Sequence, residues 1–137
     1  MPPGDFSHWY DWNDRSDFPD CTKRGVYALA LKRPDISPVM TPGNIFYIGE
    51  THGRSATLRK RLRSFYKSGS TGNLGHAGGL TYFKLDFDPD FDNVYFAVLP
   101  CGIENHEVGT AWICFKEREL IWNYADKHGR LPACNSE

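Results

Sequence analysis

The spacing of hydrophobic residues changes along this chain, and each change marks an element that we predict. Gly25 to Leu31 and Asn44 to Gly49 are short runs rich in Val, Ile, Leu, Phe and Tyr, which is typical of β-strands. The segment between them, from Arg33 to Gly43, carries the Pro and Gly residues of a loop. We therefore predict an antiparallel pair of strands across that loop.

From Ser55 the spacing becomes helical. Leu58, Leu62 and Phe65 stand at i, i+4 and i+7, and the Ser- and Gly-rich segment 68–72 ends the pattern. A helix here would gather its hydrophobic residues on one face and turn most of its basic residues away from it.

A longer helix is predicted from His106 to about Lys127, because a stop signal follows at Gly129. Hydrophobic residues occur nearly all round it, with Phe115 and Trp122 on one side and Leu120 opposite. Such a helix is expected to be central and not superficial.

The remaining segments have less regular patterns. Residues 1–24 mix aromatic and polar residues without a period, which favours an irregular extension whose aromatics pack on the domain. Leu80 to Phe87 and Val94 to Leu99 are typical of strands separated by an Asp-rich turn, and together they predict a hairpin. A Gly-rich loop before them carries His76.

Length and charge narrow the possible functions. At 137 residues the chain fits one domain with one core. Its formal net charge of −1, taken alone, argues against a strongly basic nucleic-acid binder. However, six basic residues and no acid occupy one short segment: Arg54, Arg59, Lys60, Arg61, Arg63 and Lys67. One face is therefore expected to be basic.

The spacing of the cysteines and the hydropathy of the chain bear on the cellular compartment in which the protein resides. The four cysteines are widely separated and form no C-x-x-C pair, which is typical of reduced thiols in the cytosol. The first residues have no basic leader with an apolar segment, and no stretch approaches the ~18 apolar residues of a membrane span. We expect a cytoplasmic protein without a membrane partner.

Three charged residues are candidates for chemistry. Arg61 falls at the edge of the apolar stripe, where a partly desolvated guanidinium binds phosphate well; the alternative is a solvated head on a packed stem. Glu117 and Glu119 both fall among hydrophobic neighbours, where a carboxylate needs a metal or a basic partner. An ion pair would satisfy either one, and spacing alone does not choose between them.

Three further residues have both ordinary and chemical interpretations. Tyr27 and Tyr47 stand in the two predicted strands, where core packing with a locally satisfied hydroxyl is the ordinary explanation. Asn135 is equally compatible with a simple turn. Brought to one surface with a guanidinium and a carboxylate, two phenols would suit the binding of a phosphodiester and a divalent metal, which points to nucleic-acid cleavage.

Five motifs, taken in order, resemble those of the GIY-YIG nuclease family: Gly25-Val26-Tyr27, Tyr47-Ile48-Gly49, Leu58-Arg59-Lys60-Arg61-Leu62, Glu117-x-x-Leu120-Ile121 and Pro132-x-x-Asn135. The basic run is most similar to that of the nuclease domain at the amino end of the bacterial nucleotide-excision-repair incision enzyme. The resemblance covers residues 25–137 and leaves residues 1–24 as an extension.

The resemblance implies an α/β fold of the α+β kind, with a small central antiparallel sheet flanked by helices. It also implies one divalent ion, Mg²⁺ or Mn²⁺, held by Glu117 with Glu119 as the fallback. Tyr27 would be the general base or water-orienting phenol, supported by Tyr47. Arg61 would clamp phosphate.

The resemblance further implies that Asn135 braces the site, and DNA contacts are expected from the basic residues Arg54, Arg59, Lys60, Arg63 and Lys67. Many members carry His or Tyr where this chain has Phe65, so Tyr66 and His76 are the candidate auxiliary residues. Glu50 stands where some relatives have lysine, which removes a phosphate contact.

The sequence therefore predicts a divalent-metal-dependent endonuclease that hydrolyses DNA. One alternative is a nucleic-acid-binding module on the same fold with weak or absent turnover. Another is a protein-interaction domain whose aromatic extension docks a partner. Target choice would come from the 68–93 loops, the first 24 residues, a protein partner or a homodimer.

Overall fold

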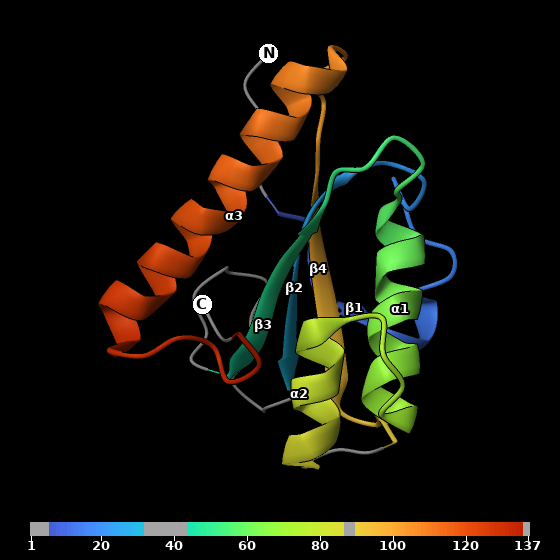
Figure 1. Cartoon of the computed structure of the whole chain (residues 1–137), viewed down its shortest axis with the longest axis vertical. Coiled ribbons are helices and arrows are strands. Elements are labelled where there is room, and N and C mark those ends of the chain that lie inside the picture. The colour runs from blue at the N-terminus through green and yellow to red at the C-terminus, as the bar shows by residue number, and fades with distance from the viewer. Residues whose placement is uncertain (1–5, 32–43, 87–89, 136–137) are drawn as a thin grey trace.

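A computed structural model describes residues 6–31, 44–86 and 90–135 (Figure 1). Within them, four strands form one sheet: β1 (Tyr10–Asp11), β2 (Gly25–Leu31), β3 (Ile45–Thr51) and β4 (Val94–Pro100). The order is β1-β4-β2-β3, and every neighbouring pair is antiparallel. The predicted pairing of the first two runs is confirmed, and β3 lies at an edge. The predicted loop 33–43 lies outside the described residues.

Helices cover both faces of the sheet. α1 (Leu58–Thr71) and α2 (Ala77–Leu85) pack on one face, and α3 (His106–His128) lies on the other (Figure 1). Alternate residues of β2 divide between the two cores, since Tyr27 packs on the α1 side and Ala28 on the α3 side. The expected α+β fold, a small antiparallel sheet flanked by helices, is confirmed.

The helix boundaries follow from capping groups. Thr57 accepts a hydrogen bond from the Lys60 amide at the start of α1, and Asn105 accepts one from Val108 at the start of α3. α1 ends at Gly72 and α3 at Gly129, with φ of 77° and 71°. No helix in the described part of the chain is long and apolar enough to cross a membrane.

The predicted hairpin of Leu80–Phe87 with Val94–Leu99 is wrong. Val94–Pro100 is a strand, but the first run forms helix α2 as far as Leu85, and Phe87 lies outside the described residues. Packing explains the difference, because a Cβ on Gly79 would lie 2.8 Å from the Phe65 carbonyl oxygen. Gly79 thus lets α2 approach α1 closely, which outweighs the strand propensity of the run.

The amino-terminal segment is more regular than predicted. Tyr10 pairs with Phe96, so β1 extends the sheet, and a 3₁₀ turn (Trp12–Asp14) follows. As expected, the aromatics pack on the domain, with Trp12 and Phe18 buried in the core.

The prediction that the long helix is central is also wrong. α3 buries Ile113 and Tyr124 against the sheet, whereas Val108, Phe115 and Trp122 are 55%, 59% and 65% exposed. The helix has hydrophobic residues on several sides, but the sheet covers only one of them.

Candidate active site

The strands β2 and β3 place two tyrosines on the same face of the sheet. Tyr27 is in register with Gly49, and Tyr47 is in register with Leu29. Because side chains alternate along a strand, both rings point to the α1 and α2 side, with centroids 5.9 Å apart.

Two glycines make room for these rings. A Cβ on Gly49 would lie 2.7 Å from the Tyr27 hydroxyl oxygen and 2.5 Å from a ring carbon of Tyr47. A Cβ on Gly78, in the first turn of α2, would lie 2.4 Å from the Tyr47 ring. The Tyr47 ring is therefore held between a strand and a helix that both lack a side chain at the point of contact.

His76 connects the N-terminus of α2 to the buried phenol. Its Nδ1 accepts a hydrogen bond from the Gly79 amide at 3.1 Å, and its Nε2 lies 2.7 Å from the Tyr27 hydroxyl. Since Nδ1 accepts, a neutral imidazole carries its proton on Nε2 and donates it to the Tyr27 oxygen. Burial lowers the pKa of His76 to about 3, with the charge of Arg61 adding to the effect, so the ring is neutral at pH 7.

Both phenols are held in their protonated form. Burial raises the pKa of Tyr27 well above its usual range and that of Tyr47 to about 12. The positive charge of Arg61 opposes the rise in both pKa values without cancelling it. At neutral pH these hydroxyls can therefore donate hydrogen bonds, but neither is a free phenolate.

Arg61 is a positive charge that acts on four of the predicted site residues: Tyr27, Tyr47, His76 and Glu117. It is half-buried on α1, as its position at the edge of the apolar stripe predicts. Its charge opposes the rise that burial causes in the pKa of Tyr27, of Tyr47 and, together with Arg118, of Glu117 on α3. The guanidinium thus interacts electrostatically with two strand tyrosines on its own side of the sheet and with a carboxylate of α3, which covers the other side.

Glu117 faces a cavity of about 160 Å³ beside β3, lined also by Tyr47, Gly78 and Asn135. Burial raises the pKa of its carboxyl to about 7, with the charge of Glu50 adding to the rise. Glu117 makes no hydrogen bond or ion pair to any residue that the structure describes. A desolvated carboxylate on a polar cavity has the oxygen chemistry that Mg²⁺ and Mn²⁺ require.

The other glutamate has a different environment. Glu119 forms an ion pair with Lys116 on the same helix, at 2.8 Å. Of the two acids between which spacing alone could not choose, Glu117 therefore lies beside Tyr47, and Glu119 is occupied by a local lysine.

Asn135 braces the edge strand. Its Oδ1 accepts the Ile48 amide and its Nδ2 donates to the Ile48 carbonyl, both at 2.9 Å. The neighbouring Cys134 amide donates to the Phe46 carbonyl at 2.7 Å. The carboxyl-terminal segment thereby satisfies outward backbone groups of β3 on either side of Tyr47 and limits its movement.

Of the two auxiliary candidates, the structure brings only His76 to the tyrosines. His76 also contacts Phe65, which stands where the resemblance would lead one to expect His or Tyr, with ring centroids 5.0 Å apart. Tyr66 instead packs on Phe91 at 5.0 Å and lies beneath the guanidinium of Arg15.

None of the predicted DNA-binding residues lines the cavity that Glu117 and Tyr47 share. Arg63 and Lys67 are exposed on α1, while Arg59 donates to the Ser16 carbonyl and Lys60 to the Ser55 carbonyl. Arg54 is exposed and lines a separate, open pocket near the start of α3.

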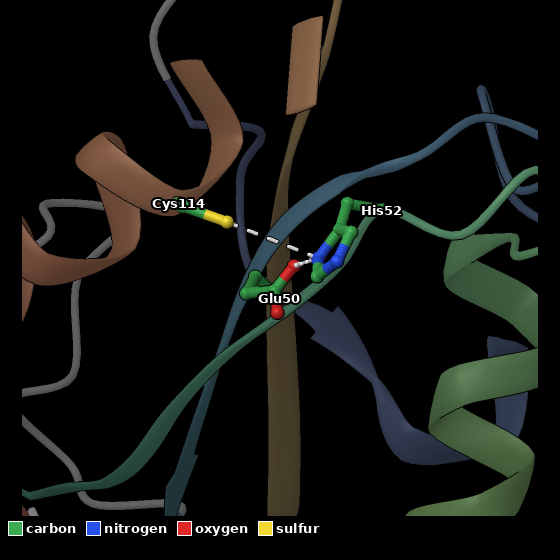
Figure 2. Close-up of side chains that lie close together, drawn as sticks. All are labelled: Glu50, His52 and Cys114. Atoms are coloured by element: carbon green, nitrogen blue, oxygen red, sulfur yellow. Dashed lines mark hydrogen bonds and ion pairs between the residues drawn. The ribbon is translucent and has the colours of Figure 1, made fainter. Parts of the chain in front are cut away.

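Sequence reasoning missed one cluster of polar side chains. Glu50 and His52, at the end of β3, lie beside Cys114 of α3 (Figure 2). Their spacing two residues apart on a strand is a signal that both face one side. Cys114 is distant in sequence, and no motif links it to them.

No family model, curated protein or solved structure shows a significant match to this chain, so the interpretation of the site depends on its own residues.

Proposed function

We propose that this protein is a GIY-YIG-type endonuclease that uses one divalent metal ion to hydrolyse DNA phosphodiester bonds in the cytoplasm. The observation that carries the proposal is the unpartnered carboxylate of Glu117 on the same small cavity as Tyr47. The guanidinium of Arg61 acts electrostatically on both Tyr47 and Glu117, and it would supply a positive charge to oppose the negative charge of a phosphodiester.

Each site residue has a role in this proposal. Glu117 would hold Mg²⁺ or Mn²⁺, which when bound polarises a phosphate oxygen and lowers the pKa of water. Arg61 would neutralise charge on the non-bridging oxygens as the bond breaks.

The phenols act as hydrogen-bond donors in the proposed reaction. Tyr47 lines the cavity and would orient the attacking water, whereas Tyr27 is fully buried beside the Tyr47 ring. We therefore assign Tyr27 to support Tyr47, the reverse of the order that the family resemblance implies. His76 holds the Tyr27 oxygen through its Nε2 proton.

The first prediction concerns the two glutamates of α3. Glu117→Gln keeps the shape of the side chain but removes the charge that would bind the metal, so nicking of supercoiled plasmid in Mg²⁺ or Mn²⁺ should fall at least ~100-fold. Glu119→Gln is the matched control, because it removes an acid from the same helix that is paired with Lys116. Equal nicking by Glu117→Gln and the wild type would reject the proposed role.

A second candidate is a DNA-binding module with little or no turnover on the same fold. Phe65 favours it, because an apolar ring contacts His76 where relatives have a proton-transfer group. Salt-dependent duplex binding without nicking in any divalent metal, by protein that is folded and carries Glu117, would support this candidate instead.

A further inference from the structure

The cluster of Glu50, His52 and Cys114 contains three different metal-ligating groups. His52 Nδ1 lies 2.6 Å from Glu50 Oε2 and 3.9 Å from Cys114 Sγ. All three ligand atoms lie within 4.8 Å of one another. Figure 2 shows the side chains pointing toward a common point between the end of β3 and α3.

The fold explains why these groups meet. Glu50 belongs to the same alternation as Ile48, whose side chain is buried in the core beneath α3, so Glu50 points toward that helix. Cys114 follows Ile113, a fully buried contact of α3 with the sheet. The packing that holds α3 on the sheet thus also holds the thiol beside the strand end.

We propose that Glu50 Oε2, His52 Nδ1 and Cys114 Sγ form a binding site for a transition-metal cation of the Zn²⁺ class. At a tetrahedral zinc centre, bonds of about 2.3 Å to sulfur and 2.0 Å to nitrogen or oxygen separate the ligand atoms by roughly 3.3–3.6 Å. The observed separations of 2.6 and 3.9 Å bracket that range. Side-chain shifts of less than ~1 Å would bring the three atoms to ligand distances.

The site differs in chemistry from the Glu117 cavity. Thiolate and imidazole ligands select Zn²⁺, Co²⁺, Ni²⁺ or copper, whereas Mg²⁺ prefers oxygen ligands only. The His52 side chain is 44% exposed and that of Glu50 20% exposed, so an ion can enter from solvent. Three protein ligands leave a fourth tetrahedral position for water or another ligand.

Cobalt provides the direct test. Co²⁺ added to the purified, reduced protein should give a sulfur-to-metal charge-transfer absorption and the visible bands of a tetrahedral centre, both displaced by Zn²⁺. Cys114→Ser should abolish the charge-transfer band and weaken Zn²⁺ binding at least ~tenfold in competition with a chromogenic chelator. His52→Asn should weaken Zn²⁺ binding to a similar extent.

Two controls make the assignment specific. Cys101→Ser changes another half-buried thiol, which contacts the carbonyls of Ile103 and Gly109, and it should leave the cobalt spectrum unchanged. Glu117→Gln should also retain the spectrum, because Glu117 supplies none of the three ligand atoms and its charge acts on the cluster only through space. Unchanged Zn²⁺ affinity in Cys114→Ser would overturn the proposal and leave Glu50 and His52 as a simple hydrogen-bonded pair. Loss of the spectrum in Glu117→Gln would overturn the three-ligand set.

Discussion

His76 shows how much one side chain can organise in this fold. One ring nitrogen caps α2 through the Gly79 amide, and the other holds the Tyr27 hydroxyl. An imidazolium has no acceptor, so protonation would break the cap as well as place a charge in the core. The histidine is therefore both a structural joint and a part of the candidate site.

Acid should destabilise the protein through His76. Its pKa is about 6.5 in the unfolded chain and about 3 in the fold, so the unfolded state binds the extra proton between these values. The free energy of unfolding should therefore fall by up to ~1.4 kcal/mol per pH unit as pH decreases from 6.5 toward 3. His76→Asn should lack this pH-dependent component because Asn does not titrate. The variant should still fold, since Asn can also cap the helix.

Denaturant titrations at pH 7, 6 and 5 measure the effect as the difference in slope between the wild type and His76→Asn. His8→Asn, a change at an exposed histidine, is the control and should follow the wild type. Parallel pH dependences for the wild type and His76→Asn would contradict the buried neutral ring.

The Tyr27 hydroxyl should matter for stability as well as for activity. Tyr27→Phe leaves the Nε2 proton of His76 buried without its acceptor, which should cost about 1–3 kcal/mol of unfolding free energy. Plasmid nicking should fall with it, because Tyr47 loses its support. Tyr47→Phe removes a hydroxyl that faces the cavity and should lower nicking with a smaller loss of stability. A Tyr27→Phe protein as stable as the wild type would refute the hydrogen-bond assignment.

At the scale of elements, β3 and α2 are placed by close contacts with the Tyr47 ring. Alanine normally favours a helix over glycine by ~1 kcal/mol. At Gly78 the added Cβ would meet the Tyr47 ring at 2.4 Å, and at Gly49 it would meet both tyrosines. The third residue of the Tyr47-Ile48-Gly49 motif thus has a steric reason to be glycine.

Gly78→Ala and Gly49→Ala should each destabilise the protein by about 1–3 kcal/mol, because the rings must move. Both should also lower nicking, since Tyr47 lines the cavity. Thermal unfolding measures the first effect. Gly53→Ala is the matched control, as its Cβ would lie 3.5 Å from Ala56, an ordinary contact. If Gly78→Ala gained stability, the helix propensity would outweigh the contact and the packing argument would fail.

An element could be predicted from the sequence when its local signals agreed with the tertiary packing, and could not when packing overrode them. β2, α1 and α3 were predicted within a few residues because their propensities, periods and caps agree with the tertiary fold. α2 was misassigned because its strand-like residues fold as a helix only when Gly78 and Gly79 can approach α1 and the Tyr47 ring. The exposed side of α3 was missed because periodicity does not say which side a sheet covers.

At the scale of the whole molecule, the near-neutral chain concentrates basic residues on α1. Arg63 and Lys67 are exposed there, on the helix that carries Arg61. In the proposed complex this helix would follow the phosphate backbone while the cavity at the β3 edge receives the scissile group. Binding would then depend on a few phosphate contacts and not on net charge.

Removing these charges should change the salt dependence of DNA binding. Arg63→Ala and Lys67→Ala should each reduce the slope of log affinity against log salt by about one, with little dependence on DNA sequence. Fluorescence anisotropy with Glu117→Gln protein in Ca²⁺ measures binding without cleavage. Lys127→Ala, an exposed charge at the far end of α3, should leave the slope unchanged. A slope altered only by Lys127→Ala would move the interface to α3.

The sequence by itself determined the local features of this protein: the two tyrosine strands, the basic helix with Arg61 at the edge of its stripe, and the stop signals of α1 and α3. These depend on neighbours within one or two turns, which a linear pattern contains. Only the tertiary structure decided that Glu117 and not Glu119 faces Tyr47, that His76 bonds Tyr27, and that Cys114 meets His52. The His76–Tyr27 and Cys114–His52 pairs join residues 49 or more positions apart in sequence. The choice between Glu117 and Glu119 depends on which side of α3 meets the sheet. Tertiary packing determines both, and a linear pattern does not contain it.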